Sequence, residues 1–458
     1  MAFMGEMEAA VGLPPSTADP DRRNLEELAR LGGYHSIELP DGHVIPGFHS
    51  VEDSRRRLAQ FPVPSDLRGK RALDIGAWDG WFTFELERRG AQVMAVDSTP
   101  IERFRTAREL LGSRAEYRIE DVCRLSPAQI GTFDLVMFLG VLYHLKHPML
   151  ALEKVCELST DMVCVESFVT DDGSDPTAKP VMEFYETDEL CGQFDNWVGP
   201  NTACLLAMCR SAGFARVQLE SVLVHRAHVT CYRHWPEIEG PQDSAAPYLT
   251  SVENAATRGR EFSGVHDDYV SIWFKSSRAG LTAADVFPRV GPYGSHPVYL
   301  RNTGEDGWQV NCKLPPGLAP GWHAATVRTT GSSWGNSVRI GVDISAAERR
   351  QRPAQAEASG IRIAIATDGK TWERNLVHTG LGSCISLWVS GLPEEAARDG
   401  VAVWLDGDDL PCVFLSEPDP QGLRQINAML PTGAQPGDCS VSASFRGTLS
   451  APVPVRLA

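Results

Sequence analysis

The stretch that decides the fold reads ALDIGAWDGWF and covers residues 72–82. It begins in an apolar strand at 71–75, turns through 76–80, and continues into a segment with the pattern of a helix. A second apolar strand follows and ends in Asp97. This order predicts a βαβ unit with glycines at the first turn and an acid at the end of the second strand. In such a unit the turn approaches a ligand closely, and the later carboxylate binds ribose hydroxyls.

Strands and helices alternate from about residue 71 to about residue 234, which predicts a mainly parallel sheet with helices on both faces. The last two strands follow each other too closely for a crossover, so we expect an antiparallel hairpin at one sheet edge. The predicted fold class is α/β, with a Rossmann-like sheet of seven strands. The expected strands are 71–75, 92–97, 115–119, 133–139, 161–168, 216–224 and 227–233, and the expected helices are 80–89, 101–111, 148–158 and 201–212.

Short β segments with Gly and Pro turns replace this alternation after about residue 265. YVSIWF at 269–274 matches CISLWV at 384–389, and WQVN at 308–311 matches RQIN at 424–427. This internal repeat predicts two homologous β-sandwich modules, which resemble immunoglobulin-like modules of the IPT/TIG type. We interpret the repeated residues as core and turn positions; they are Trp273/Trp388, Asn311/Asn427 and Pro315/Pro431.

The composition is that of a soluble chain with several domains: 458 residues, 43% of them hydrophobic, and a net charge of −16. We expect no signal peptide and no membrane span, because no apolar run is long enough. The eleven cysteines form no CxxC pairs, which predicts reduced thiols in the cytoplasm and no metal site. The acidic balance disfavours a large nucleic-acid partner.

The first turn resembles motif I of the class I methyltransferases that use S-adenosylmethionine (SAM), because Trp78 stands where a dehydrogenase fingerprint needs a glycine. The resemblance implies that Asp97 holds the ribose, and that an acid and an apolar residue after the third strand hold the adenine. Asp97 could instead cap a helix, and Asp121 could cap a turn. The predicted cofactor residues are Asp74, Gly76, Ala77, Trp78, Gly80, Asp97, Asp121, Val122, Leu139 and Gly140.

The segments FDLVMFL (133–139), GVLYH (140–144), VCVESFVTD (163–171) and NWVGPN (196–201) resemble the tRNA wobble-uridine carboxymethyl/methyltransferase family. The resemblance covers roughly residues 50–235. It implies carboxy-SAM as the donor, with its carboxylate held by a cation before motif I, an aromatic residue after the fifth strand, and an arginine opening the last strand. In this sequence those positions fall at Arg56, Trp197 and Arg226. Arg56 could equally lie on a solvated helix face, and Arg226 could simply flank an edge strand.

The groups that we expect near the reactive methyl are His144, Tyr143 and Glu166. His144 could act as a general base near neutral pH, or it could be a buried structural histidine. Residues 172–200 are rich in acids and aromatic residues and predict a substrate lid. The predicted substrate-binding residues are Arg56, Tyr185, Asn196, Trp197 and Arg226, although Trp197 could instead anchor the following helix.

Together these observations predict an N-terminal extension and lid (1–60), a SAM-dependent methyltransferase domain (61–265), a first β-sandwich (266–345), a linker (346–360) and a second β-sandwich (361–458). We expect methylation of a hydroxyl on a small or glycan-like acceptor, and self-association through the β modules. Two alternatives remain open at this point: a tRNA wobble-uridine carboxymethyltransferase that uses carboxy-SAM, and a ligand-binding scaffold without catalysis.

Overall fold

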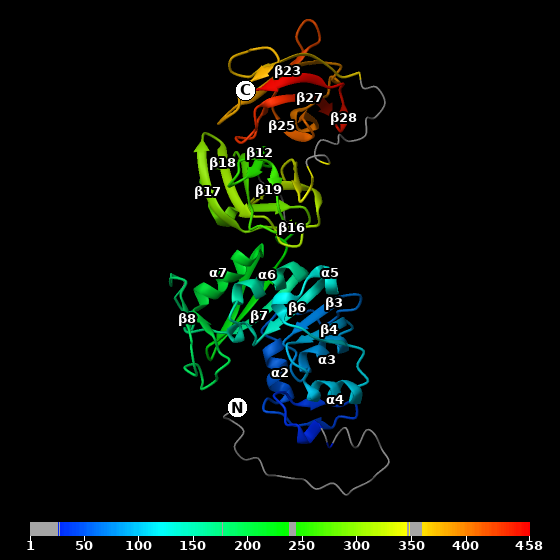
Figure 1. The fold of residues 1–458 in the computed structure, drawn as a ribbon, viewed down its shortest axis with the longest axis vertical. Helices are drawn as coiled ribbons and strands as arrows, with labels where there is room; N and C mark the ends of the chain where they lie inside the picture. Colours follow the sequence, from blue (N-terminus) through cyan, green and yellow to red (C-terminus); the bar gives the residue numbers. More distant parts are fainter. Residues whose placement is uncertain (1–25, 27, 176, 238–243, 346–347, 349–359) are drawn as a thin grey trace. The chain divides into compact units, whose positions relative to one another are not determined.

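The computed structural model describes residues 26, 28–175, 177–237, 244–345, 348 and 360–458. Residues 1–25 and 27 of the expected N-terminal extension, and most of the expected linker, lie outside these residues. The chain divides into two compact units, one up to Arg233 and one from His234 to Ala458 (Figure 1). The boundary therefore lies earlier than the predicted residue 265. The reason is that β12 (Tyr248–Asn254) pairs with β14 (Tyr269–Lys275) in a sheet of the second unit.

The first unit contains the predicted seven-stranded sheet, in the order β10-β11-β7-β6-β3-β4-β5. β3 to β7 are parallel, whereas β11 runs antiparallel to both of its neighbours, so the expected edge hairpin is confirmed. The order reverses at β3, which lies between β4 and β6. The strands are β3 (Arg71–Ile75), β4 (Gln92–Asp97), β5 (Glu116–Ile119), β6 (Phe133–Leu139), β7 (Ser159–Phe168), β10 (Arg216–Leu223) and β11 (Arg226–Tyr232).

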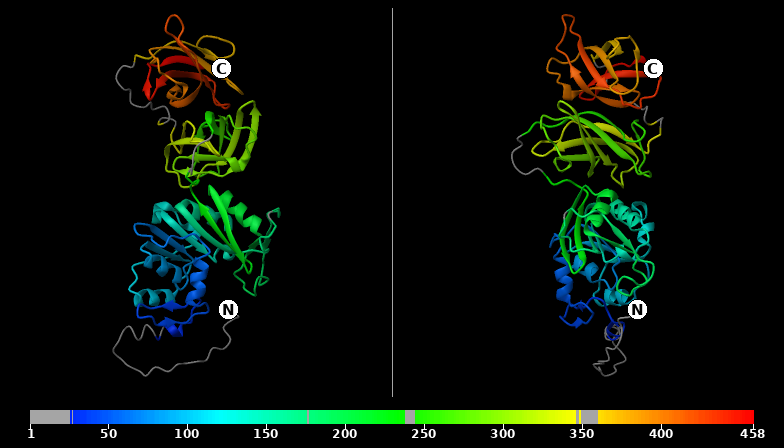
Figure 2. Two further views of the ribbon diagram at one scale, coloured as in Figure 1. Left: turned by 180° about the vertical axis from the view of Figure 1, so that it is seen from behind. Right: turned by 90° about the vertical axis from the view of Figure 1, so that its left-hand side faces the viewer.

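Helices cover both faces of this sheet (Figures 1 and 2). One hydrophobic core joins the sheet to α6 and α7, and a second core joins it to α2 and α3. Burying apolar side chains on both faces is what stabilises a parallel sheet. The helices are α2 (Val51–Leu58), α3 (Trp81–Arg88), α4 (Glu102–Leu110), α5 (Pro127–Ile130), α6 (Pro148–Leu158) and α7 (Thr202–Ala212), with short 3-10 helices η1 (Val122–Arg124) and η2 (Leu142–His144).

Two further hairpins belong to the first unit. β1 (Ile37–Glu38) and β2 (Val44–Ile45) pair around a turn at Asp41-Gly42. β8 (Met182–Phe184) and β9 (Val198–Pro200) pair within the insertion at 172–200. Both elements come from segments outside the βαβ repeat, so neither is needed to complete the sheet.

The second unit contains two modules with matching topology. In the first module, sheet β12-β14-β18-β17 and sheet β13-β20-β19-β15-β16 share one core. In the second module, β21 to β29 form one nine-stranded sheet around another core, in the order β21-β23-β26-β25-β24-β27-β29-β22, with β28 paired to β27. The other strands are β13 (Glu261–Phe262), β15 (Val286–Val290), β16 (Tyr293–Gly294), β17 (Pro297–Gly304), β18 (Gly307–Lys313), β19 (Gly321–Thr329), β20 (Val338–Val342), β21 (Arg362–Asp368), β22 (Leu376–Val377), β23 (Cys384–Ser390), β24 (Val401–Leu405), β25 (Asp408–Leu415), β26 (Arg424–Met429), β27 (Gly437–Phe445), β28 (Thr448–Leu449) and β29 (Val453–Leu457).

The pairing of equivalent strands supports the internal repeat. Phe262 pairs in parallel with Val342 in the first module, and Val377 pairs in parallel with Leu457 in the second. The interpretation of the repeated tryptophans as core residues is wrong, however. Trp273 pairs opposite Gln309, and Trp388 pairs opposite Gln425, at half-buried positions that alternate with core residues along β14 and β23.

The two modules also contact each other, which the sequence interpretation of a separating linker did not foresee. The buried Arg260 donates a 2.6 Å hydrogen bond to the main-chain oxygen of Asp409. The Arg339 guanidinium lies 3.8 Å from the ring centre of Trp322 and 4.7 Å from that of Trp404. Groups of the second module therefore cover part of the Arg260 and Arg339 side chains of the first, and these contacts offset the cost of burying the two charges.

Candidate functional site

The turn between β3 and α3, which we call the donor turn (residues 76–80), has a backbone that glycine permits. Gly76 and Gly80 have φ of 75° and 92°. A Cβ at Gly76 would lie 2.3 Å from a methyl of Val141, and one at Gly80 would lie 2.6 Å from the Phe84 ring. Both glycines are therefore required by conformation and by space. Ala77 is buried between them, and Trp78, with φ of 52°, is half exposed.

Two carboxylates frame the donor turn. Asp74 is buried in β3, where its Oδ2 accepts a 2.6 Å hydrogen bond from the Thr83 hydroxyl. Burial raises the pKa of Asp74 to about 7. Asp97 ends β4, and its two oxygens accept hydrogen bonds from the main-chain nitrogens of Trp78 (2.8 Å) and Ser98 (3.0 Å). The alternative that Asp97 caps a helix is wrong, because the N-cap of α4 is Ile101.

Asp121 and Val122 lie beyond the next strand. The exposed Asp121 accepts a hydrogen bond of 2.9 Å from the main-chain nitrogen of Cys123 and caps η1, as the alternative interpretation expected. Val122 is buried in the sheet core. The predicted acids therefore do lie at the carboxyl ends of neighbouring parallel strands.

A buried carboxylate lies at the end of β7. Glu166 is 1% exposed, and its oxygens accept hydrogen bonds from the guanidiniums of Arg226 and Arg57. Arg226 also donates a 3.0 Å bond to the Tyr143 hydroxyl. We call these four residues the arginine cluster. Burial alone would raise the pKa of Glu166, but Arg226 and Arg57 overcome this and hold the pKa below its usual range.

The predicted role of Arg56 is not supported by its position. Its side chain is 69% exposed and pairs with Asp53 on the outer face of α2. One residue along the helix, Arg57 is only 22% exposed and contacts Glu166 at 3.3 Å. Adjacent residues point about 100° apart around a helix, so only one of them can face the sheet. The cation before the donor turn is therefore Arg57.

Gly140 lies at the end of β6, the strand between β3, which leads into the donor turn, and β7, which carries Glu166 of the arginine cluster. It follows Leu139 at the end of β6 with φ of 71°, and its main-chain nitrogen donates a 3.0 Å bond to the main-chain oxygen of Glu166. A Cβ at Gly140 would have only side-chain neighbours, the nearest at 3.5 Å from Arg226. The peptide at Gly140 therefore borders the cluster directly.

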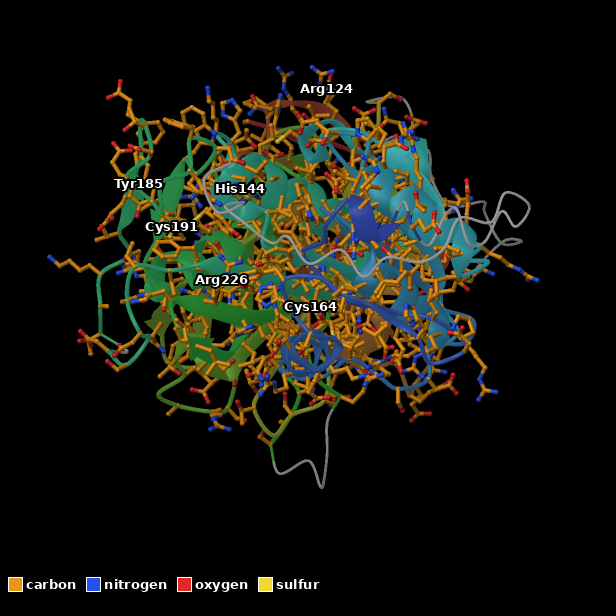
Figure 3. All side chains as sticks on the ribbon, turned by 90° about the horizontal axis from the view of Figure 1, so that it is seen from below. Arg124, His144, Cys164, Tyr185, Cys191 and Arg226 are labelled. Carbon is orange, nitrogen blue, oxygen red and sulfur yellow. The ribbon has the colours of Figure 1, made fainter. Side chains whose placement is uncertain are left out.

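His144 follows at the end of η2 (Figure 3). Its Nδ1–H donates a 3.1 Å hydrogen bond to the main-chain oxygen of Asp195, in the insertion. This bond leaves the Nε2 lone pair of a neutral ring free to accept a proton. Burial lowers the pKa of His144, although the Asp195 carboxylate opposes this shift.

The insertion supplies the other predicted residues. The main-chain nitrogen of Trp197 donates a 2.7 Å bond to Tyr143, and that of Tyr185 donates a 2.9 Å bond to Trp197. The Tyr185 hydroxyl donates to Glu183, whereas Asn196 is buried and donates to the main-chain oxygen of Leu190. Lys146 lies 3.9 Å from the ring centre of Trp197. The insertion is thus attached to the segment that carries Tyr143 and His144.

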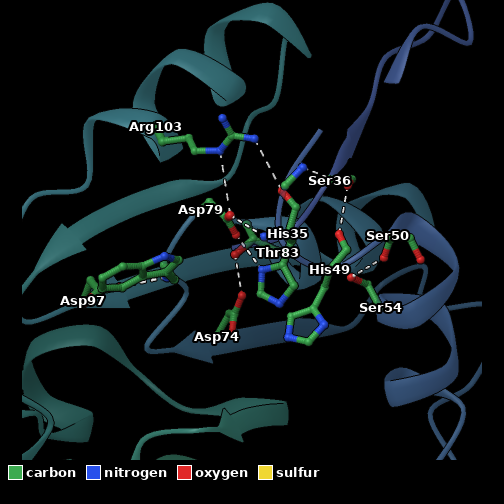
Figure 4. A network of polar contacts seen from close by, with 12 residues as sticks. His35, Ser36, His49, Ser50, Ser54, Asp74, Asp79, Thr83, Asp97 and Arg103 are labelled. Carbon is green, nitrogen blue, oxygen red and sulfur yellow. Dashed lines mark hydrogen bonds and ion pairs between the residues drawn. The ribbon is translucent and has the colours of Figure 1, made fainter. Parts of the chain in front are cut away.

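A buried polar cluster around Asp79 of the donor turn was not predicted from the sequence (Figure 4). Asp79 is fully buried, and His35 donates to it from its main-chain nitrogen (2.7 Å) and its ring Nδ1 (2.5 Å). Arg103, on α4, lies 3.8 Å from the same carboxylate. An acid inside a turn and a histidine in a hairpin both have local explanations, so no sequence signal joined them.

Comparison with known proteins places a methyltransferase domain in this unit. Residues 73–158 match the family described as "Methyltransferase domain". The chain is 28% identical over 190 residues to the tRNA U34 carboxymethyltransferase of Pseudomonas paraeruginosa, which covers 39% of this chain and 57% of that protein. It is 24% identical over 218 residues to that of Aeromonas hydrophila, with 46% and 64% covered. The chain thus spans little more than half the length of the first of these curated relatives.

Among solved structures, the N-terminal domain of EvdMO1, crystallised with SAH and D-fucose, is 21% identical with a TM-score of 0.35 and covers 48% of this chain and 98% of that one. The match of residues 73–158 to the methyltransferase domain family confirms the prediction of a methyltransferase domain. Within the described residues, no group of acids, cysteines and histidines could hold a metal ion, and no helix is long and apolar enough to cross a membrane.

Proposed function

We propose that the methyltransferase domain of this chain transfers a methyl group from SAM to a hydroxyl of a small or glycan-like acceptor. The observation that carries this proposal is the set of groups at the carboxyl ends of the parallel strands. The donor turn and Asp97 lie on one side, and the arginine cluster and His144 lie on the other. Open α/β sheets bind ligands at this edge, where the strand order reverses.

The residues on the donor side fit SAM. The glycine-permitted turn brings main-chain atoms close to a ligand, and the mostly buried Asp97 carboxylate is held in one orientation by two main-chain nitrogens. A fixed carboxylate suits the paired hydroxyls of a ribose. Asp121 and Val122 would flank the adenine, and Leu139 and Gly140 would lie beside the sulfonium. SAM, when bound, supplies a methyl group that is activated by its positive sulfur.

The arginine cluster favours SAM over carboxy-SAM. A carboxylated donor needs a cation whose hydrogen-bond donors are not already held by another carboxylate. Here the Glu166 carboxylate accepts from both Arg226 and Arg57. A second carboxylate would compete with Glu166 for these donors, and each charge-assisted bond that it displaced would cost about 1.5–3 kcal/mol. The protein therefore carries its own carboxylate where the resemblance implied that of the donor.

His144 is the base that the geometry favours for the acceptor. The acceptor oxygen would form a bond to the methyl carbon as the carbon–sulfur bond breaks, which leaves S-adenosylhomocysteine (SAH). The acceptor proton would pass to Nε2 of His144, whose Nδ1–H is fixed by Asp195. Tyr143 and Glu166 would orient the acceptor, with Tyr185 and Trp197 at the rim. Most of the catalytic effect would come from positioning.

A tRNA acceptor with carboxy-SAM is the second candidate, favoured by the names of the curated relatives. The net charge of −16 and the occupied arginines oppose it. The third candidate is a scaffold that binds a ligand without catalysis. For the second unit we propose two immunoglobulin-like modules of the IPT/TIG type, through which copies of the chain could associate. No disulfide joins any of the eleven cysteines, all of which lie in the described part of the chain, and this is consistent with a cytoplasmic location.

Two measurements test the proposal. Mass spectrometry of the nucleosides that copurify with the full chain should find SAM or SAH, and finding carboxy-SAM would promote the tRNA candidate. The purified protein should then transfer label from methyl-labelled SAM to a member of a panel of monosaccharides and small polyols. Transfer should be lost in Asp97→Ala. Binding of SAM without transfer to any hydroxylated compound would favour the scaffold.

A further inference from the structure

Residues 33–49 precede the donor turn in the sequence by a whole strand and helix, yet they are bonded to it. We call them the N-terminal cover. The Asp79 carboxylate, which is 0% exposed within the donor turn, accepts from the main-chain nitrogen and the ring Nδ1 of His35. Both bonds join the cover to the turn that carries Gly76, Trp78 and Gly80 (Figure 4).

Arg103 binds the cover from the other side. Its guanidinium donates to three main-chain oxygens that precede or belong to the cover, those of Leu28, His35 (3.5 Å) and Pro46 (3.2 Å). Its Nε lies 3.8 Å from Asp79. Burial lowers the pKa of Arg103, although Asp79 opposes this. A buried guanidinium is stable only with such a partner, so the cover, Arg103 and Asp79 depend on one another.

The backbone of the cover is shaped for this contact. A Cβ at Gly33 would lie 2.2 Å from the Arg103 side chain, and a Cβ at Gly47 would lie 2.4 Å from the main chain of His35. A larger residue at Gly33 would require the Arg103 side chain or the cover to move, and one at Gly47 would require the main chain of the cover itself to move. The two glycines therefore have a spatial requirement that the turn at Asp41-Gly42 does not explain.

The cover also lies close to the arginine cluster. Tyr34 lies 6.0 Å, measured to its ring centre, from the guanidinium of Arg57, and the His49 ring packs against Tyr34 at 4.6 Å. Burial first, and then the positive charges of Arg57 and Arg226, lower the pKa of His49. One segment therefore contacts the donor turn through His35 and approaches the arginine cluster through Tyr34 and His49.

We propose that Asp79 and Arg103 are positioning residues, which clamp the N-terminal cover onto the donor turn so that donor binding and closure of the cover are coupled. This inference rests on the proposed function, because it takes the ligand of the turn to be SAM. A donor that fixes the turn fixes the orientation of Asp79, and so favours the closed cover. Conversely, a closed cover holds the donor turn in the conformation that binds SAM, since coupling of this kind is reciprocal.

Hydrogen exchange of the full chain, with and without saturating SAH, tests the coupling. In the wild type SAH should slow exchange in residues 33–49 at least tenfold. In Asp79→Asn, which keeps the size of the side chain but loses its charge, exchange there should be faster without ligand. SAH should no longer slow it, and SAH affinity should fall about tenfold, the scale of one charge-assisted bond. Arg105→Ala, on the exposed side of α4, is the matched control and should behave as wild type.

Gly33→Ala keeps every clamp residue but places a Cβ where the Arg103 guanidinium lies, so the contact between Arg103 and the cover should be weakened. This variant serves if Asp79→Asn does not fold. Peptides from β3 and β6 report whether the sheet is intact in each variant. If the wild type does not bind SAH, the proposed function is wrong. The clamp is then tested by hydrogen exchange without ligand, which should be faster in residues 33–49 of Asp79→Asn than in the wild type. Protection of residues 33–49 by SAH that persists in both Asp79→Asn and Gly33→Ala overturns the clamp.

Discussion

The donor side and the acceptor side of the site are built in different ways. The donor side takes its groups from consecutive strands within residues 74–122, each at the end of one parallel strand. The acceptor side joins Arg57 of α2, Glu166 of β7 and Arg226 of β11, which are separated by 109 and 60 residues. A local motif specifies the donor side, whereas the fold assembles the acceptor side from distant segments.

This difference also separates the electrostatics of the two sides. On the donor side, burial raises the pKa of Asp74 and of Asp97, because no cation compensates the loss of water. On the acceptor side, two guanidiniums hold the pKa of the equally buried Glu166 down. The donor side thus lacks a cation beside its carboxylates, whereas on the acceptor side two guanidiniums share one carboxylate and keep a net positive charge.

Replacement of Glu166 should have the largest effect. Glu166→Gln leaves two guanidiniums facing a neutral amide, and breaking a buried ion pair by removing one partner costs about 3–5 kcal/mol. Hydrogen exchange at β6 and β7 measures this as a loss of opening free energy. Glu157→Gln, which removes a surface pair with Lys154, is the control and should cost less than about 1 kcal/mol. Equal stability of the two variants would mean that the arginine cluster does not stabilise the sheet.

Asp74 should make the stability of the first unit depend on pH. In the folded protein it keeps its proton up to a pKa of about 7, whereas the unfolded chain releases it near a pKa of about 3.9. Its contribution to stability is therefore fully present below about pH 4 and is lost as pH rises toward about 7, by up to about 4 kcal/mol. In Asp74→Asn this component should be absent.

Hydrogen exchange at β3, corrected for the pH dependence of intrinsic exchange, checks the Asp74 prediction between pH 4 and pH 8. The stability of wild type relative to Asp74→Asn should decrease across this range. Asp66→Asn is the control, because Arg68 lowers the pKa of Asp66 to about 2 and the group stays ionised throughout. A difference between wild type and Asp74→Asn that does not change with pH would show that Asp74 is already ionised.

The sequence predicted the positions of the strands and acids on the donor side, because each of these features has a local signal. The alternation of strands and helices gave the seven-stranded sheet, and the acids after the strands fell at one sheet edge. The repeated segments gave two modules of equal topology. The domain boundary was misplaced because Tyr248–Asn254 has no regular alternation of its own, and joins its sheet only through β14.

Several contacts on the acceptor side and around Asp79 could not be predicted from the sequence. Arg56 and Arg57 are neighbours in a run of arginines, and counting residues cannot decide which one faces the sheet. Only the packing of α2, in which Leu58 and Ser54 are buried, fixes its rotation. The bonds from His35 and Arg103 to Asp79 depend on how the segment before α2 folds back, and no periodicity encodes that return.

Replacement of Asp97 tests the donor side directly. Asp97→Ala removes the carboxylate assigned to the ribose, and loss of a hydrogen bond to a charged group costs about 1.5–3 kcal/mol, or about one to two decades in affinity. Isothermal titration of the full chain with SAH measures it. Glu102→Ala, on the exposed side of α4, should bind SAH as the wild type does. Unchanged affinity in a folded Asp97→Ala protein would remove the donor site from this sheet edge.

The smallest effect should come from the two neighbouring arginines of α2, and it distinguishes the predicted site from the observed one. Arg56→Ala removes only an exposed pair with Asp53 and should change stability by less than about 0.5 kcal/mol. Arg57→Ala removes a bond to the buried Glu166, which keeps Arg226 as a partner, so its cost should lie near the lower end of the range, about 1.5 kcal/mol. Both residues are arginines at neighbouring positions of one helix, so the change in helix propensity is about the same in both variants. Hydrogen exchange at β7 should therefore respond to Arg57→Ala and not to Arg56→Ala. The reverse order would mean that α2 is rotated, and that Arg56 is the residue that faces the acceptor side after all.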